Sequence, residues 1–132
     1  MPATITPPRP AVTAAPPGDP APHTDVWGHV ARVTAWLDAA NGRGPHETAA
    51  RIMKITEEAG EAVAAYLAAT GQNPRKGITA TPGELAGELC DVVLAALVAL
   101  ATITGGTPPA EAALASHVAA RAARLSSLRA AA

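Results

Sequence analysis

The sequence has few cysteines and few aromatic residues. Its 132 residues include one cysteine, two tryptophans, one tyrosine and no phenylalanine. A single cysteine excludes an internal disulfide, and without a Cys-x-x-Cys or Cys/His pairing the chain offers no zinc or thioredoxin-like motif. We therefore expect a reducing, cytoplasmic setting, with Cys90 as a small packing residue.

Excess charge and long apolar runs are absent as well. Ten Lys and Arg stand against eleven Asp and Glu, which gives a net charge of -1 and no general attraction to nucleic acid. The longest apolar run, "VVLAALVALATI" at 92–103, is shorter than the ~18 residues expected of a spanning helix. From these features we expect no nucleic acid polymer and no membrane as partner.

Proline is concentrated at the N-terminus. Closely spaced prolines remove backbone donors and block helix formation, and residues 1–23 contain no basic region followed by an apolar core. We predict a disordered Pro/Ala-rich tail over 1–23 and a single helical domain over 24–132.

The rest of the chain is rich in alanine, valine and leucine, separated by Gly and Pro. Four amphipathic segments follow one another, and none alternates with period two. They span about 25–40, 47–70, 82–104 and 107–128. Thr81, Pro82 and Glu84 form a capping-box pattern at the start of the third. We predict an all-α, four-helix bundle that assembles into oligomers, because so small a core gains much from a partner.

Carboxylates gather on the second and third segments. Glu57, Glu58 and Glu61 lie within one alanine-rich helix, and Glu88 and Asp91 lie on the next. At about 100° per residue, each Glu-x-x-Glu or Glu-x-x-Asp pair falls on one helix face. If the two helices run antiparallel, the pairs meet at comparable depth.

Such a cluster of like charges is costly unless a cation neutralises it, and Lys54 is the one cation at the start of that stretch. Oxygen ligands without His or Cys suit Mg²⁺, with Mn²⁺ as a substitute. A single such pair is usually a solvated helix face, but two pairs on successive helices favour a metal site.

The spacing Glu57-Glu58-x-x-Glu61 followed by Glu88-x-x-Asp91 resembles the MazG-like family of all-α nucleotide pyrophosphohydrolases, over about residues 26–128. The resemblance implies a dimer or tetramer that uses Mg²⁺ to hydrolyse a nucleoside triphosphate to the monophosphate and pyrophosphate. It implies the metal ligands Glu58, Glu61, Glu88 and Asp91. Glu57 would orient or activate the water.

Phosphate and base contacts are further expectations. Arg75 and Lys76, in the loop after the second segment, are candidates for the β and γ phosphates. The resemblance also places His117 and Arg121 toward the phosphates, with His117 where the family usually has Lys. Trp27 is the candidate for stacking on the base.

Two other interpretations stay open. A helical module of the same fold that binds a nucleotide or a protein without turnover is favoured by His117 in place of Lys. A helical interaction domain with exposed glutamate faces requires both acidic pairs to arise by chance.

Overall fold

The computed structural model describes residues 25–130, and all of its regular structure is helical. The helices are α1 (Val26–Asn41), α2 (Pro45–Ala69), α3 (Pro82–Thr104) and α4 (Thr107–Ala130). The all-α prediction is confirmed for this part of the chain, and the predicted ends lie within about two residues of the observed ones. The predicted disordered tail, 1–23, falls outside the described residues.

Local capping explains where the helices begin. The Asp25 carboxylate accepts a hydrogen bond from the Gly28 amide at 2.7 Å and so starts α1. At the start of α3 the Thr81 hydroxyl accepts from the Glu84 amide at 3.2 Å, and the Glu84 carboxylate accepts from the Thr81 amide at 2.6 Å. The predicted capping box is therefore present. The left-handed Gly105, with φ of 86°, ends the same helix.

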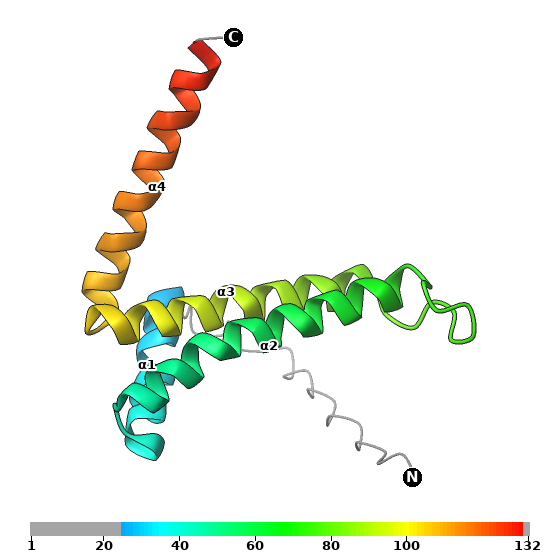
Figure 1. The fold of residues 1–132 in the computed structure, drawn as a ribbon, viewed down its shortest axis with the longest axis horizontal. Helices are drawn as coiled ribbons and strands as arrows, with labels where there is room; N and C mark the ends of the chain where they lie inside the picture. The colour runs from blue at the N-terminus through cyan, green and yellow to red at the C-terminus, as the bar shows by residue number, and fades with distance from the viewer. Residues whose placement is uncertain (1–24, 131–132) are drawn as a thin grey trace, which may run out of the picture.

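Helices α2 and α3 form a long antiparallel hairpin, and α1 packs against the end where α2 begins and α3 ends (Figure 1). The apolar core lies at that end. It consists of Val30, Leu97, Val98, Ala101 and Ala110, surrounded by Trp27, Val33, Leu37 and Leu100. Small residues dominate this core, which allows the helices to approach closely but buries little apolar area.

α2 buries a face that its apolar residues do not predict. The buried residues are Arg51, Glu58 and Ala62, whereas the large apolar side chains of Val63 and Tyr66 are exposed. Buried charged residues need partners of opposite sign or hydrogen bonds. We therefore expect the candidate functional residues on the buried face of α2.

α4 leaves the rest of the molecule after the Gly105-Gly106 turn (Figure 1). Its first turn is anchored by Ala110, which is fully buried, but every residue from Glu111 to Ala130 is exposed. A closed four-helix bundle requires every helix to pack along its neighbours. Beyond its first turn, α4 does not pack along the other three helices.

α3 is the one helix among residues 25–130 that is long and apolar enough to cross a membrane. The core helix of a soluble protein meets the same criterion. Leu97, Val98, Ala99 and Ala101 in the second half of α3 are buried, and its first half carries Glu84, Glu88 and Asp91. The expectations of a cytoplasmic setting and of no membrane partner stay predictions.

Candidate metal centre and adjoining cavity

Two clusters of charged side chains lie along the buried face of α2. The first, which we call the Arg51 network, consists of Asp38, Arg43, Glu47, Arg51 and Thr102. Arg51 Nη2 lies 3.0 Å from Asp38 Oδ1, and Arg51 Nε lies 2.9 Å from Glu47 Oε1. Arg51 Nη1 donates to Thr102 Oγ1 at 3.0 Å, and Arg43 Nε lies 2.7 Å from Asp38 Oδ2. Its two guanidinium groups are thus matched by two carboxylates.

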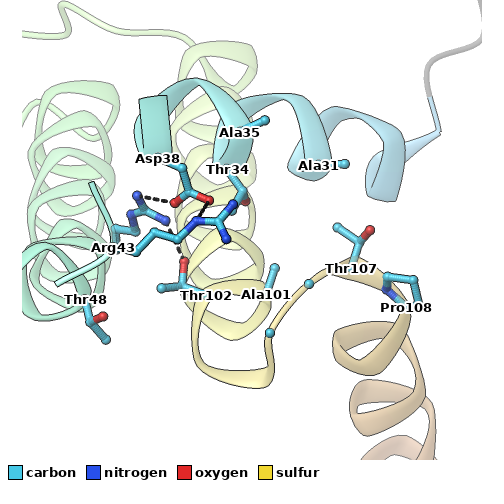
Figure 2. Close-up of a pocket in the computed structure, with 13 residues that line it drawn as sticks. Ala31, Thr34, Ala35, Asp38, Arg43, Thr48, Ala101, Thr102, Thr107 and Pro108 are labelled. Carbon is cyan, nitrogen blue, oxygen red and sulfur yellow. Dashed lines mark hydrogen bonds and ion pairs between the residues drawn. The ribbon is translucent and has the colours of Figure 1, made fainter. Parts of the chain in front are cut away.

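A cavity of about 410 Å³ borders the Arg51 network between α1 and the α3–α4 turn (Figure 2). Asp38 and Thr102, which both contact the Arg51 guanidinium, line this cavity. The Arg51 hydrogen bond lowers the pKa of Glu47, and Asn41 contributes a second one. Because its charges pair with one another, this network ties α1, α2 and α3 together and leaves no charge for a ligand.

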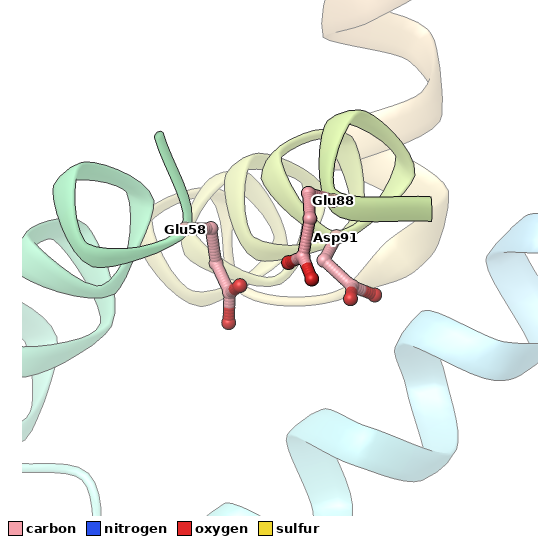
Figure 3. A group of neighbouring side chains, drawn as sticks. All are labelled: Glu58, Glu88 and Asp91. Atoms are coloured by element: carbon pink, nitrogen blue, oxygen red, sulfur yellow. The ribbon is translucent and has the colours of Figure 1, made fainter. Parts of the chain in front are cut away.

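The second cluster, which we call the acidic cluster, consists of Glu58 on α2 and Glu88 and Asp91 on α3 (Figure 3). One carboxylate oxygen from each lies within 4.8 Å of the others. Glu58 is buried and the other two are half-buried. Three of the four predicted metal ligands are therefore brought together by the antiparallel hairpin.

Glu61, the fourth predicted ligand, lies beside this group but is not part of it. The negative charge of Glu58 raises the pKa of the Glu61 carboxyl, and the charge of Glu88 adds to the effect. Such a shift records electrostatic crowding. Glu61 therefore interacts electrostatically with the cluster from its edge.

Glu88 carries the clearest unmet requirement of the acidic cluster. Its Oε2 atom is buried and has no hydrogen-bond partner. A buried carboxylate oxygen without a donor is costly, and native structures rarely leave one so. A cation among these carboxylates would give the atom a partner of opposite charge.

Lys54 supplies part of the missing charge. Its Nζ lies 2.7 Å from Glu58 Oε1 and 2.8 Å from Glu57 Oε2. These hydrogen bonds, first that of Glu57 and then that of Glu58, raise the pKa of Lys54. The i,i+3 and i,i+4 spacing of these residues predicts both ion pairs. Counting Lys54 only as a nearby cation misses its pairing with Glu57 and Glu58. Glu57 is 58% exposed and faces Lys54.

A second cavity, which we call the site cavity, adjoins the acidic cluster. Its volume is about 410 Å³, and Glu58, Asp91 and Lys54 line it together with apolar residues of α1 and α3. The other lining residues are His29, Val33, Trp36, Leu37, Asn41, Glu47, Ala50, Arg51, Leu94, Ala95 and Val98. Apolar residues line much of this cavity, and charged and polar side chains line the rest, which suits an amphipathic ligand.

Three residues of the site cavity were missed by sequence reasoning. Trp36 contributes its aromatic ring, His29 an imidazole, and Asn41 an amide whose Nδ2 donates to Glu47 Oε1 at 3.3 Å. Trp27, the predicted stacking residue, packs against the core instead. Both tryptophans flank the apolar stripe of α1, so the stripe alone does not distinguish them.

The predicted phosphate contacts are not brought to the acidic cluster within one chain. Arg75 and Lys76 lie in the loop beyond α2, and ~16 Å of helix separates Glu58 from the end of α2 at Ala69. His117 and Arg121 lie on the exposed part of α4. In the described chain none of the four lines the site cavity.

Comparison of the chain with family models, with curated proteins and with solved structures finds no match in any of the three. Function therefore rests on the residues and their geometry.

Proposed function

We propose that this chain is an Mg²⁺-dependent nucleotide pyrophosphohydrolase, which hydrolyses a nucleoside triphosphate between the α and β phosphates. The observation that supports this most is the acidic cluster at the edge of the site cavity, with a buried carboxylate oxygen that lacks a partner. A cation site for phosphates and an apolar space for a nucleoside then stand side by side.

The residues present fit a hard divalent cation. Glu58, Glu88 and Asp91 offer oxygen ligands only, which Mg²⁺ and Mn²⁺ prefer, and Glu61 is the fourth candidate ligand. When bound, such an ion neutralises phosphate charge and lowers the pKa of bound water. Such an ion would balance the negative charge of the cluster and would give the buried Glu88 oxygen a partner.

The chain's own groups divide the remaining work. Lys54 holds Glu58 and Glu57 in place by direct ion pairs. We assign Glu57 as the general base that accepts the proton of the attacking water. The water oxygen forms a bond to the α-phosphorus, the bond from that phosphorus to the bridging oxygen breaks, and pyrophosphate leaves with the bridging oxygen.

The site cavity would hold the nucleoside. Its volume of about 410 Å³ falls within the usual range for small-molecule sites. Trp36 offers a face for stacking, and Asn41 and His29 offer polar atoms to the edge of a base.

A nucleotide-binding module without turnover is the second candidate. It is favoured by the absence of the predicted phosphate contacts from the site cavity of the described chain. It is also favoured by Lys54, which compensates part of the cluster's charge without an ion.

The deciding experiment measures pyrophosphate and orthophosphate released from ribo-, deoxyribo- and modified nucleoside triphosphates, with and without Mg²⁺. Inorganic triphosphate serves as the substrate without a nucleoside. We expect metal-dependent pyrophosphate from at least one nucleotide and at least a ~1000-fold loss in Asp91→Ala. Glu111→Ala, which removes an exposed carboxylate of α4, should keep the activity. Nucleotide binding without product would establish the second candidate instead.

A further inference from the structure

The cavity beside the Arg51 network, which we call the network cavity, has an unmet requirement for a hydrogen bond of its own. Thr34 lines this cavity, and its Oγ1 atom is buried without a hydrogen-bond partner. Within residues 25–130 only one other side-chain atom, Glu88 Oε2, shares that property. Because a buried hydroxyl without a partner is costly, Thr34 makes the network cavity a candidate binding site.

The other threonines of the network cavity show that Thr34 is an exception. Thr102 Oγ1 donates to the Val98 carbonyl at 2.8 Å, and Thr48 Oγ1 donates to the Gly44 carbonyl at 3.3 Å. Both hydroxyls thus bond to a backbone carbonyl four residues earlier, as is common in helices. Thr34 lies within α1 but makes no such bond. Its side chain is half-buried, and rotation about χ1 exchanges the places of its hydroxyl and methyl groups, so the hydroxyl can reach a ligand in the cavity.

The charges that line the network cavity are already paired. Asp38 Oδ1 lies 3.0 Å from Arg51 Nη2, and Asp38 Oδ2 lies 2.7 Å from Arg43 Nε. An ionic ligand would compete with one of these pairs, which is costly at Arg51 because its side chain is only 4% exposed. An uncharged ligand leaves both pairs intact.

Hydrogen-bond donors and small apolar walls remain for such a ligand. The Arg43 side chain is 81% exposed and pairs with Asp38 through Nε, which leaves its two terminal amino groups to donate to a ligand oxygen. Ala31 and Ala35 on α1 and Ala101 near the end of α3 contribute only methyl groups (Figure 2). The volume of about 410 Å³ falls within the usual range for small-molecule sites.

We infer that the network cavity is a second small-molecule site, which binds an uncharged ring compound through its carbonyl or hydroxyl oxygens. Arg43 and Thr34 donate to these oxygens, and the alanine methyl groups contact the ring. Nucleosides and neutral sugars share this chemistry. The site does not depend on the proposed hydrolase, because none of the residues of the acidic cluster lines the network cavity.

The site is tested on the full chain by calorimetric titration with uridine, adenosine, ribose and glucose. Ala35→Leu narrows the network cavity, whereas Ala39→Leu adds the same bulk to α1 at a position that lines neither cavity. Both positions are exposed, so both variants should fold normally. We expect at least one compound to bind the wild type and Ala39→Leu equally, and Ala35→Leu at least ~10-fold more weakly.

The four compounds distinguish the two sources of the ligand, because a site for sugars binds ribose or glucose and a site for nucleosides requires the base. Binding of none of the four, or equal binding to Ala35→Leu and Ala39→Leu, would overturn the inference. The 5′-monophosphate of the nucleoside that binds should lose the part of the binding that depends on Ala35. If that part is retained, the site is not one for uncharged ligands.

Trp36→Ala tells the two cavities apart. Trp36 lines the site cavity but not the network cavity, so binding at the network cavity should persist in this variant. Loss of binding in Trp36→Ala together with normal binding in Ala35→Leu would assign the compound to the site cavity and refute a second site. Neither result depends on turnover, so failure of the proposed hydrolase would be seen separately.

Thr34→Val tests the unpaired hydroxyl without a ligand. Valine keeps the shape of the side chain, and the ligand-free variant should unfold at the same or a higher temperature than the wild type, because the hydroxyl has no partner to lose. Thr102→Val is the control and should unfold at a lower temperature, since Thr102 Oγ1 accepts from Arg51 Nη1 at 3.0 Å. The compound that binds should raise the unfolding temperature of Thr34→Val less than that of the wild type. A destabilised ligand-free Thr34→Val, or an equal rise in the two proteins, would remove Thr34 from the site.

Discussion

The Arg51 network and the acidic cluster occupy the same face of α2, seven residues apart at Arg51 and Glu58, yet they balance charge differently. Two guanidinium groups meet two carboxylates in the first, and each charge is within ion-pair distance of an opposite one. In and around the second, the three carboxylates of the acidic cluster and the neighbouring Glu57 and Glu61 make five negative charges, and the one ammonium of Lys54 leaves a net of four.

Under the proposed function, this difference separates a structural role from a functional one. The Arg51 network is complete with the residues of one chain, so it can stabilise the junction of α1, α2 and α3 at all times. The acidic cluster leaves Glu88 Oε2 without a partner and raises the pKa of Glu61 through repulsion by Glu58. Such an arrangement is costly for stability, and the proposed cation would offset that cost.

The largest expected effect is on stability at the Arg51 network. Arg51→Ala leaves Asp38 and Glu47 without their buried partner and should lower the free energy of unfolding by about 3–5 kcal/mol. Denaturant unfolding measures this, and Arg43→Ala, which removes the exposed guanidinium of the same network, is the control with a much smaller loss. A loss below about 1 kcal/mol in Arg51→Ala would show that the network does not hold the fold.

The opposite sign is expected at the acidic cluster. Without metal, Asp91→Ala relieves repulsion and should leave stability equal or higher by about 1 kcal/mol. The same variant should no longer be stabilised by Mg²⁺, which raises the unfolding midpoint of the wild type by mass action. Marked destabilisation of metal-free Asp91→Ala would mean that the carboxylate is structural, as in the Arg51 network.

Lys54 sharpens the comparison because it is the only ion-pair partner of Glu58 within residues 25–130. Lys54→Gln removes a positive charge beside the candidate ligands and should tighten Mg²⁺ binding roughly fivefold, equivalent to ~1 kcal/mol. Calorimetric titration of both proteins measures the change. Unchanged or weaker binding would show that Lys54 organises the ligands more than it competes with the ion.

The two regions should also respond oppositely to acid. The pKa of Glu47 is lowered, so its contribution to stability is present above its unfolded value near 4.5 and is lost as pH falls through its folded pKa. The pKa of Glu61 is raised, so its unfavourable contribution is full above its folded pKa and is relieved as pH falls through that value. Unfolding from pH 7 to pH 3 of Glu47→Gln and Glu61→Gln, each against the wild type, should give differences of opposite sign. Differences of the same sign would contradict the assignment.

Features fixed by local interactions were the ones the sequence predicted well. The capping box at Thr81 and Glu84 involves residues three apart, and the i,i+3 carboxylate pairs need only a helix to share a face. The antiparallel hairpin then follows from the turn between α2 and α3. These steps predicted the joining of Glu58, Glu88 and Asp91.

Features set by tertiary packing were not predictable in the same way. The burial of Arg51 depends on Asp38 of α1 and Thr102 of α3, which are distant in sequence. The direction of α4 depends on how Ala110 packs at the end of α3. The sequence of α4 does not show that its apolar residues, such as Leu114 and Leu125, are exposed in one chain. Trp36 rather than Trp27 reaches the site cavity because of how α1 is rotated against the core.

The most direct test of the account is Mn²⁺ binding followed by electron paramagnetic resonance, in the wild type and in Glu88→Gln. Glu88→Gln keeps the size of the side chain and removes the charge of the buried carboxylate that lacks a partner. We predict saturable binding to the wild type, at least a ~10-fold weaker affinity in the variant, and displacement of Mn²⁺ by Mg²⁺. Equal affinity in the two proteins, or no saturable binding to the wild type, would contradict the claim that the acidic cluster is a metal site.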